Sequence, residues 1–184
     1  MTKQMTSRER VATALNHQEP DRVPLDIGAG QSTGLVVEAY ENLQAYTGIT
    51  GASGWLSKTF RVARLDDATL ARLGSDVRPL QLRQPRNWQP PASEANTFID
   101  EFGIKWQQAP LPGGGYYWEQ LTFPLAEATL ADLDKYPWPD PHDPGRYAGL
   151  AEEAADLYHN TPYAILGDCG FKNHWEPLFM LCGM

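Results

Sequence analysis

Cysteine is scarce in this chain, whose 184 residues include only Cys169 and Cys182. Two cysteines supply no disulfide framework, which fits the reducing environment of the cytoplasm. The chain also lacks an excess of basic residues, since its formal net charge is −8 and no basic cluster offsets it. A nucleic-acid surface is therefore not expected, because phosphate backbones are bound by clustered Lys and Arg.

Long apolar runs are missing as well. No stretch approaches the roughly 20 apolar residues that a membrane-spanning helix needs. The first residues, MTKQMTSRERV, lack the apolar region of an export signal. We therefore expect a cytoplasmic protein with no membrane partner. A chain of this length can bury a sizeable core, and its hydrophobic fraction of 42% is that of a globular protein.

The stretch from Thr6 to Gly30 is the most informative part of the sequence. Thr6 and Glu9 have the spacing of a capping box, which predicts that a helix begins here. A proline-marked break follows, because proline lacks the amide proton that a helix needs. The short apolar run Leu25-Asp26-Ile27 comes next, and we expect it to be a buried strand.

Three residues near this expected strand are candidates for a site. Gly28 and Gly30 would let the backbone turn sharply or approach a ligand closely, so we assign them to substrate binding. Asp26 interrupts the apolar run. Its carboxylate either caps a turn or takes part in an active site, and we treat it as a catalytic candidate.

The order of the later elements indicates an α/β fold with parallel strands. Two further wall strands are expected around Val77 and Ile165, with the charged residues beside Val77 at a strand end rather than deep in a core. Three strands are too few for a complete eight-stranded barrel, which takes about 250 residues. Helices are expected at residues 34–47, 66–73, 129–136, 145–160 and 174–182.

Residues 84–124 are expected to form a loop and β-hairpin insertion outside the barrel wall. Their first part is rich in proline and polar residues, and two short antiparallel strands are predicted within residues 98–106. A further strand follows the glycine triplet at residues 113–115. Trp118 on that strand either lines a pocket for a flat ring or packs in the hairpin core, and we treat it as a substrate-binding candidate.

Four segments taken in order resemble the N-terminal half of the uroporphyrinogen decarboxylase superfamily: SRERVATALNHQEPDRVPLDIG, DEFGIKW, TLADLDKYPWPDP and YAILGDCG. The resemblance covers nearly the whole chain, so residues 1–184 are expected to form a single partial barrel domain. It implies the N-terminal part of a TIM (β/α)8 barrel, left incomplete. It also implies one of two chemistries. One is cofactor-free decarboxylation of a porphyrinogen. The other is methyl transfer between corrinoid-carrying proteins and thiols or other acceptors through a zinc-bound thiolate.

The chain resembles the methyltransferase-like branch more closely. True uroporphyrinogen decarboxylases share an Arg-Gln-Ala-Gly-Arg-Tyr segment after the first strand, whose arginines hold substrate carboxylates. The equivalent residues 26–32 contain no arginine, and the nearest ones, Arg22 and Arg61, do not restore the pattern. We expect tetrapyrrole-related chemistry, with corrinoid-dependent methyl transfer in the complete protein. Porphyrinogen decarboxylation is the alternative.

The resemblance assigns no metal or other cofactor to this chain. The zinc ligands of the methyltransferase branch, a His-x-Cys pair and a later Cys, belong to the second half of such proteins, so zinc and a corrinoid are expected in the complete protein. Cys169, His174 and Cys182 have the spacing C-x4-H-x7-C, which is looser than that of structural zinc sites. Buried structural cysteines are the favoured interpretation.

The end of the strand around Ile165 supplies further site candidates. Catalytic residues of TIM barrels lie at the carboxyl ends of strands, so Asp168 is a catalytic candidate, as a general base, an orienting group or a helix cap. Cys169 beside it is assigned to substrate binding. The resemblance adds Glu176 as a catalytic candidate, with a helix-start carboxylate as the alternative.

A non-catalytic, truncated remnant is a further alternative. Residues 175–184 stop within an apolar helical pattern, and an open partial barrel would leave strand edges unpaired. We expect the chain alone to be a poor enzyme and to associate with itself through the open barrel. Its expected partners are a tetrapyrrole or a corrinoid-carrying protein.

Overall fold

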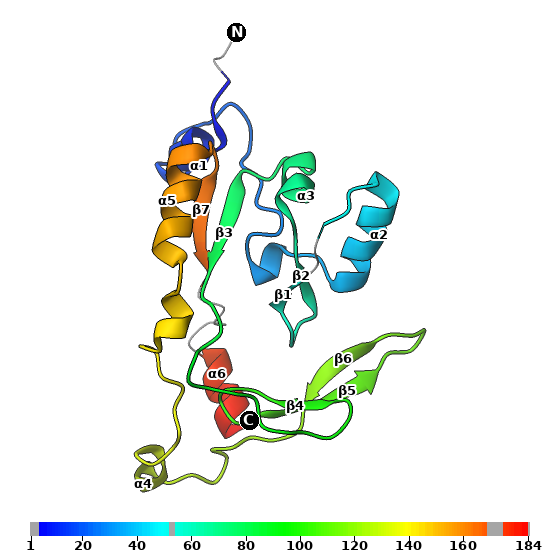
Figure 1. The fold of residues 1–184 in the computed structure, drawn as a ribbon, viewed down its shortest axis with the longest axis vertical. Coiled ribbons are helices and arrows are strands. Elements are labelled where there is room, and N and C mark those ends of the chain that lie inside the picture. The colour runs from blue at the N-terminus through cyan, green and yellow to red at the C-terminus, as the bar shows by residue number, and fades with distance from the viewer. Residues whose placement is uncertain (1–3, 52–53, 169–174, 184) are drawn as a thin grey trace. The chain divides into compact units, whose positions relative to one another are not determined.

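The computed structural model describes residues 4–51, 54–168 and 175–183. The fold is a mixture of helices and open sheets, and the described strands do not close into a barrel (Figure 1). The chain divides into two compact units, each with its own core; the described strands form two two-stranded sheets in unit 1 and one three-stranded sheet in unit 2. Unit 1 is Met1–Leu82 with Ala148–Gly170, and unit 2 is Arg83–Tyr147 with Phe171–Met184.

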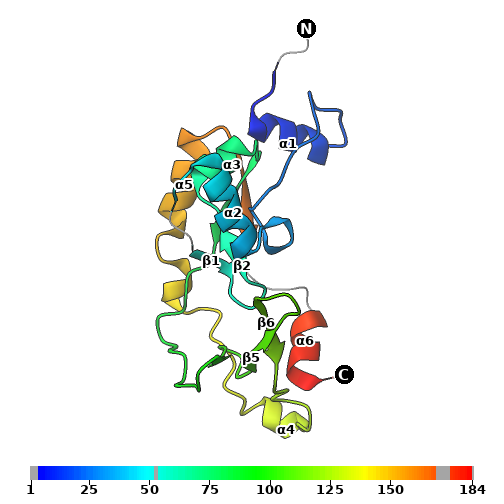
Figure 2. The same ribbon diagram turned by 90° about the vertical axis from the view of Figure 1, so that its right-hand side faces the viewer.

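Unit 1 contains four α-helices, a short 3-10 helix and four strands. These are α1 (Ser7–Leu15), η1 (Gln31–Thr33), α2 (Val37–Thr47), β1 (Gly54–Ser57), β2 (Val62–Arg64), α3 (Asp67–Arg72), β3 (Val77–Gln81), α5 (Leu150–Asn160) and β7 (Ala164–Asp168). β1 and β2 form an antiparallel hairpin. β3 and β7 pair in parallel, as the two strands after α3 and α5 were expected to do. α5 lies along this parallel pair and contacts both strands (Figures 1 and 2).

The predicted starts of α1 and α3 are confirmed, whereas α2 begins at Val37, three residues after the predicted start. The Glu9 N–H donates to Thr6 Oγ1 at 3.2 Å, and the Thr6 N–H donates to Glu9 Oε2 at 2.8 Å, which completes the capping box of α1. α3 follows Asp66, whose Oδ1 accepts from the Thr69 N–H at 2.9 Å. Such caps form because they satisfy amides of the first turn that have no partner within the helix.

The strand predicted at Leu25-Asp26-Ile27 is wrong. The segment makes one backbone hydrogen bond to the start of β3, from the Asp76 N–H to the Leu25 carbonyl at 2.7 Å. Its own amides donate to side chains instead: the Leu25 N–H to Asp76 Oδ2 at 2.9 Å and the Ile27 N–H to Ser75 Oγ at 3.2 Å. Because side-chain oxygens take these amides, the segment runs extended beside β3 without a ladder.

The prediction that the charges beside Val77 avoid the core is also wrong. Asp76 is fully buried and the Arg78 side chain is 3% exposed. Arg78 Nε donates to Asp67 Oδ1 at 2.7 Å, and its guanidinium lies 3.4 Å from the ring centroid of Tyr163. Charges tolerate such burial because each is paired and hydrogen-bonded.

The helix predicted over residues 145–160 is interrupted. Gly149 has φ 74°, a left-handed conformation that a helix interior does not contain. The chain therefore forms a separate 3-10 turn, η2 (Pro144–Tyr147), and α5 begins only at Leu150. Tyr147 belongs to that turn rather than to the helix that was expected to include it.

The apolar core of unit 1 is small. Tyr40, Ala63, Leu65 and Leu70 are buried together between α2, β2 and α3. Helix α2 ends at Gly48, which has φ 70°, as the sequence predicts. These elements fix the position of β2, which matters for the site described below.

Unit 2 is built on a three-stranded antiparallel sheet. Its regular elements are β4 (Thr97–Ile99), β5 (Lys105–Pro110), β6 (Tyr116–Gln120), α4 (Leu130–Leu133), η2 and α6 (Trp175–Cys182). The antiparallel strands within residues 98–106 and the strand after the glycine triplet are confirmed. Ile104, Trp106, Leu125 and Leu181 form the core of the unit. Residues 84–124 thus contain the whole sheet of unit 2.

None of the helices in the described ranges is both long and apolar enough to cross a membrane.

Candidate functional site

The carboxyl ends of β3 and β7 lie side by side in unit 1. Their last paired residues are Gln81 and Asp168, and Gln81 Nε2 donates to Asp168 Oδ2 at 3.1 Å. Arg64 at the end of β2 donates from Nη2 to Gln81 Oε1. The two hydrogen bonds hold the Gln81 amide from both sides. The Gln81 side chain is buried, with 6% of its surface exposed. We refer to Arg64, Gln81 and Asp168 as the strand-end cluster.

One face of the β3–β7 sheet carries the strand-end cluster. Side chains alternate between the two faces along a strand, so Leu166 shares the face of Asp168. A Cβ at Gly30 would lie 3.7 Å from Leu166 Cδ2, which is ordinary van der Waals contact. The loop that contains Gly30 therefore lies against the same face as the cluster.

That loop is fixed internally by Asp26 and Thr33. Asp26 Oδ1 accepts from the Ala29 N–H and from Thr33 Oγ1, both at 3.2 Å. The Gly28 N–H donates to the Thr33 carbonyl at 2.9 Å, and the Gly30 N–H donates to Thr33 Oγ1 at 3.1 Å. Asp26 is half-buried and caps this turn. These hydrogen bonds support the turn-capping role of Asp26. The catalytic role of Asp26 stays a prediction.

The two glycines assigned to substrate binding have different local environments. Gly28 has φ +83°, and a Cβ there would lie 2.9 Å from Leu65 Cδ2, so both conformation and packing require glycine. Gly30 has φ −130°, a conformation open to other residues. The backbone of Gly28 thus packs against the core of unit 1, while Gly30 lies beside the sheet face that carries the strand-end cluster.

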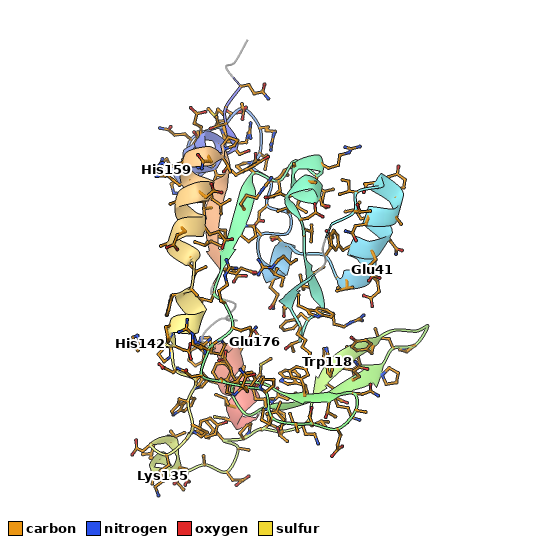
Figure 3. All side chains as sticks on the ribbon, in the orientation of Figure 1. Glu41, Trp118, Lys135, His142, His159 and Glu176 are labelled. Carbon is orange, nitrogen blue, oxygen red and sulfur yellow. The ribbon has the colours of Figure 1, made fainter. Side chains whose placement is uncertain are left out.

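The remaining candidates belong to unit 2 or lie outside the described residues. Trp118 on β6 packs against the unit 2 core and makes an edge contact with Phe98, with ring centroids 4.6 Å apart. Glu176 is half-buried in the first turn of α6. Figure 3 labels Trp118 and Glu176 on these elements. Cys169 lies outside the described residues. Among the described candidates, Asp26, Gly28, Gly30 and Asp168 therefore belong to unit 1, and Trp118 and Glu176 belong to unit 2.

Cys182 is exposed, so the interpretation of both cysteines as buried structural residues is wrong for this one. Leu181 beside it is 3% exposed and packs in the core of unit 2. Successive residues on a helix are about 100° apart, and the side chain that follows Leu181 is therefore directed away from the core. His174 lies outside the described residues.

Two members of the strand-end cluster, Arg64 and Gln81, were missed by the sequence analysis. Gln81 ends the strand predicted around Val77, so the rule that selected Asp168 at a strand end applies to it equally. Arg64 has no such marker, because its place depends on the β1–β2 hairpin, which the sequence leaves ambiguous. The cluster combines the donors of a guanidinium with the acceptors of a carboxylate and can therefore bind polar groups of either kind.

Metal binding has no support in the described part of the chain. Among those residues, no three or more His, Cys, Asp or Glu side chains lie close enough together to hold a metal ion.

The comparisons with known proteins do not extend this description. No family model matches the chain, and neither curated proteins nor solved structures gave a match.

Proposed function

We propose that this chain supplies the first strands of a (β/α)8 barrel of the uroporphyrinogen decarboxylase superfamily. We further propose that the complete protein carries out corrinoid-dependent methyl transfer. One observation carries the proposal: β3 and β7 are parallel, and their carboxyl ends place Gln81 and Asp168 together. Strand ends of this kind hold the reacting groups of TIM-barrel enzymes.

The arrangement of the first segments gives further support. The extended residues 25–27 lie beside the start of β3 through the Asp76–Leu25 backbone hydrogen bond, and β3 pairs with β7. The three segments are thus neighbours in the order in which they occur in the sequence. Parallel neighbours such as β3 and β7 are what the wall of a (β/α)8 barrel contains.

The strand-end cluster has defined tasks in this proposal. Asp168 would accept a hydrogen bond or a proton from a bound group. Arg64 would donate to carboxylate or amide groups on the periphery of a tetrapyrrole. Asp26 would keep the neighbouring loop in place through its bond to the Ala29 N–H. In the methyltransferase-like branch that this chain resembles, zinc activates the thiolate that accepts the methyl group. The described residues do not supply a zinc site, so we derive no step through zinc.

Tetrapyrrole binding tests the proposal directly. The chain is titrated with hydroxocobalamin and, separately, with uroporphyrin, and binding is followed by absorbance and tryptophan fluorescence. We expect saturable binding of the corrinoid, weakened about tenfold in Asp168→Asn, the scale of one lost charged hydrogen bond. Glu41→Gln is the matched control, because Glu41 is exposed on α2 in the same unit (Figure 3). Binding of neither compound would contradict the proposal and favour the non-catalytic alternative.

A porphyrinogen carboxy-lyase is the second candidate, and Arg64 is the observation that favours it. Residues 26–32 lack the arginines that hold substrate carboxylates, yet Arg64 from β2 reaches the same strand ends through Gln81. If this candidate is right, uroporphyrin binds and the corrinoid does not. Arg64→Met would then weaken uroporphyrin binding more than Asp168→Asn does, because the ligand carboxylates need a cation.

A further inference from the structure

Gln81 occupies a central position in the strand-end cluster. Its Oε1 accepts from Arg64 Nη2, and its Nε2 donates to Asp168 Oδ2 at 3.1 Å. One side-chain amide therefore joins a cation on the β1–β2 hairpin to a carboxylate on β7. The two bonds also fix the orientation of the amide, since only its oxygen can face the guanidinium and only its nitrogen can face the carboxylate.

We propose that Gln81 is a positioning residue, which sets the direction of the Asp168 carboxylate and of the Arg64 guanidinium at the carboxyl ends of the strands. The effect of Gln81 on ligand binding rests on the proposed function. The geometric part stands by itself, because it depends only on the two amide contacts and on the burial of the side chain.

Three features of the fold suit Gln81 to this task. It is opposite Asp168 in the last pair of a parallel ladder, so the two side chains project on one face. It is 6% exposed, so water competes little for its amide. The pairing of β3 with β7 holds its backbone, while the longer Arg64 side chain arrives from a separate hairpin. A rigid group of this kind can orient two others at low entropic cost.

The first experiment does not depend on any ligand. The side-chain amide of Gln81 is assigned by NMR, with Gln81→Met to identify its signals. We expect both amide protons to be separated from those of exposed glutamines, and to shift in Asp168→Asn and in Arg64→Met. Signals at the positions of exposed glutamines, unmoved by either substitution, would overturn the inference.

The second experiment measures ligand binding. Gln81→Met keeps the length of the side chain and removes both hydrogen bonds. We expect it to weaken binding of the tetrapyrrole that the wild-type chain binds by about tenfold, the scale of one or two lost hydrogen bonds. Gln44→Met is the matched control, because Gln44 Nε2 donates to the Gly51 carbonyl at 3.2 Å in the same unit. Equal affinity of Gln81→Met and the wild type would count against a positioning role.

A charge-swapped double variant tests the hydrogen bond between the side chains of residues 81 and 168. Combining Gln81→Glu with Asp168→Asn restores an amide–carboxylate hydrogen bond with its polarity reversed and keeps an acceptor for Arg64. We expect the double variant to recover the melting temperature lost in Gln81→Glu alone. A double variant no more stable than Gln81→Glu would show that the two side chains do not share this bond and would count against the inference. Should the wild-type chain bind neither tetrapyrrole, the proposed function fails, while the amide signals still decide whether Gln81 holds its two neighbours.

Discussion

Arg10 on α1 and Asp76 ahead of β3 form a buried ion pair, with 2.5 Å between Nη1 and Oδ1 and side chains that are 4% and 0% exposed. The Asp76 carboxylate also accepts from Arg22 Nη1 at 2.7 Å, from Ser7 Oγ at 2.8 Å and from the Leu25 N–H at 2.9 Å. This network fastens the first helix and the extended segment to the amino end of β3. It lies at the opposite end of that strand from Gln81, so we assign it to stability rather than to the site.

We predict that Asp76→Asn destabilises the chain by about 2 kcal/mol, because the buried Arg10 guanidinium then keeps only Asp21 as a negative partner and several charged hydrogen bonds are lost. Urea denaturation followed by circular dichroism measures the loss. Glu41→Gln, which removes an exposed carboxylate from the same unit, should leave the midpoint unchanged. A midpoint for Asp76→Asn equal to that of the control would show that the network contributes nothing to stability.

The same carboxylate predicts a dependence of stability on pH. Burial by itself raises the pKa of Asp76, but hydrogen bonds from Leu25, Ser7 and Arg22 and the charge of Arg10 outweigh it and hold the pKa below its ordinary value. A lowered folded-state pKa stabilises the fold above the unfolded-state value of about 3.9, and this stability is lost as the pH falls through the folded-state pKa. The stability difference between wild type and Asp76→Asn should therefore shrink below about pH 4. Denaturation series at several pH values measure it, and a constant difference down to pH 2 would contradict the assignment.

We predict that the buried carboxyl of Asp100 in unit 2 makes stability depend on pH in the opposite direction. Burial raises the pKa of its carboxyl, and the hydrogen bonds from Trp106 Nε1 and the amides of Phe102 and Ile104 do not offset this. The folded state therefore holds its proton to a higher pH than the unfolded state does. Stability contributed by this group falls as the pH rises from the ordinary aspartate value through the raised one.

Trp106 fluorescence should report this titration, because its indole N–H donates to Asp100 Oδ2 at 2.9 Å. We expect an emission change above the ordinary aspartate pKa that disappears in Asp100→Asn. The exposed Asp134 provides the control, since Asp134→Asn should leave the titration in place. Persistence of the emission change in Asp100→Asn would assign it to another group.

Local features of this fold could be predicted from the sequence, because their partners lie within a few residues. The Thr6–Glu9 capping box and the Asp66 cap each join atoms three residues apart. Asp168 was found for a similar reason: it stands at the end of a compact apolar strand. In these cases the neighbouring sequence contains nearly all of the interactions that decide the structure.

Long-range contacts decided what the sequence analysis missed. Residues 25–27 form no strand, and the amides of Ile27 and Leu25 donate to the side chains of Ser75 and Asp76, which are 48 and 51 residues away. Gln81 lies at the end of a strand that the sequence predicts, but its contact with Asp168, 87 residues later, depends on the pairing of β3 with β7. These contacts have no trace in local spacing, because each depends on which segments become neighbours.

Gly28 and Gly48 allow backbone strain to be separated from packing. Both have positive φ, of 83° and 70°, but a Cβ at Gly28 would lie 2.9 Å from Leu65 Cδ2, while nothing lies within 4 Å of one at Gly48. We predict that Gly48→Ala costs about 1 kcal/mol, the penalty of a left-handed alanine. Gly28→Ala should cost about 1–3 kcal/mol more, because the added methyl overpacks the core. Urea denaturation of both variants gives the difference, and equal losses would mean that Leu65 moves aside freely.

The β3–β7 sheet leads us to predict self-association. β7 pairs with β3 alone among the described strands, and Leu166 on it remains 39% exposed. A strand with an unpaired edge and an exposed apolar side chain is a ready surface for another chain. We expect sedimentation coefficients that rise between micromolar and millimolar protein. Leu166→Glu should suppress the rise, because a charge on this face opposes association.

Leu130→Glu provides the matched control for that experiment. Leu130 is 84% exposed on α4, which belongs to unit 2 and is not part of the β3–β7 sheet. If both variants reduce association equally, general surface hydrophobicity explains it and the sheet does not. If the wild-type chain sediments as a single monomer over the whole range, the exposed strand is protected in solution by the chain itself, and the prediction is wrong.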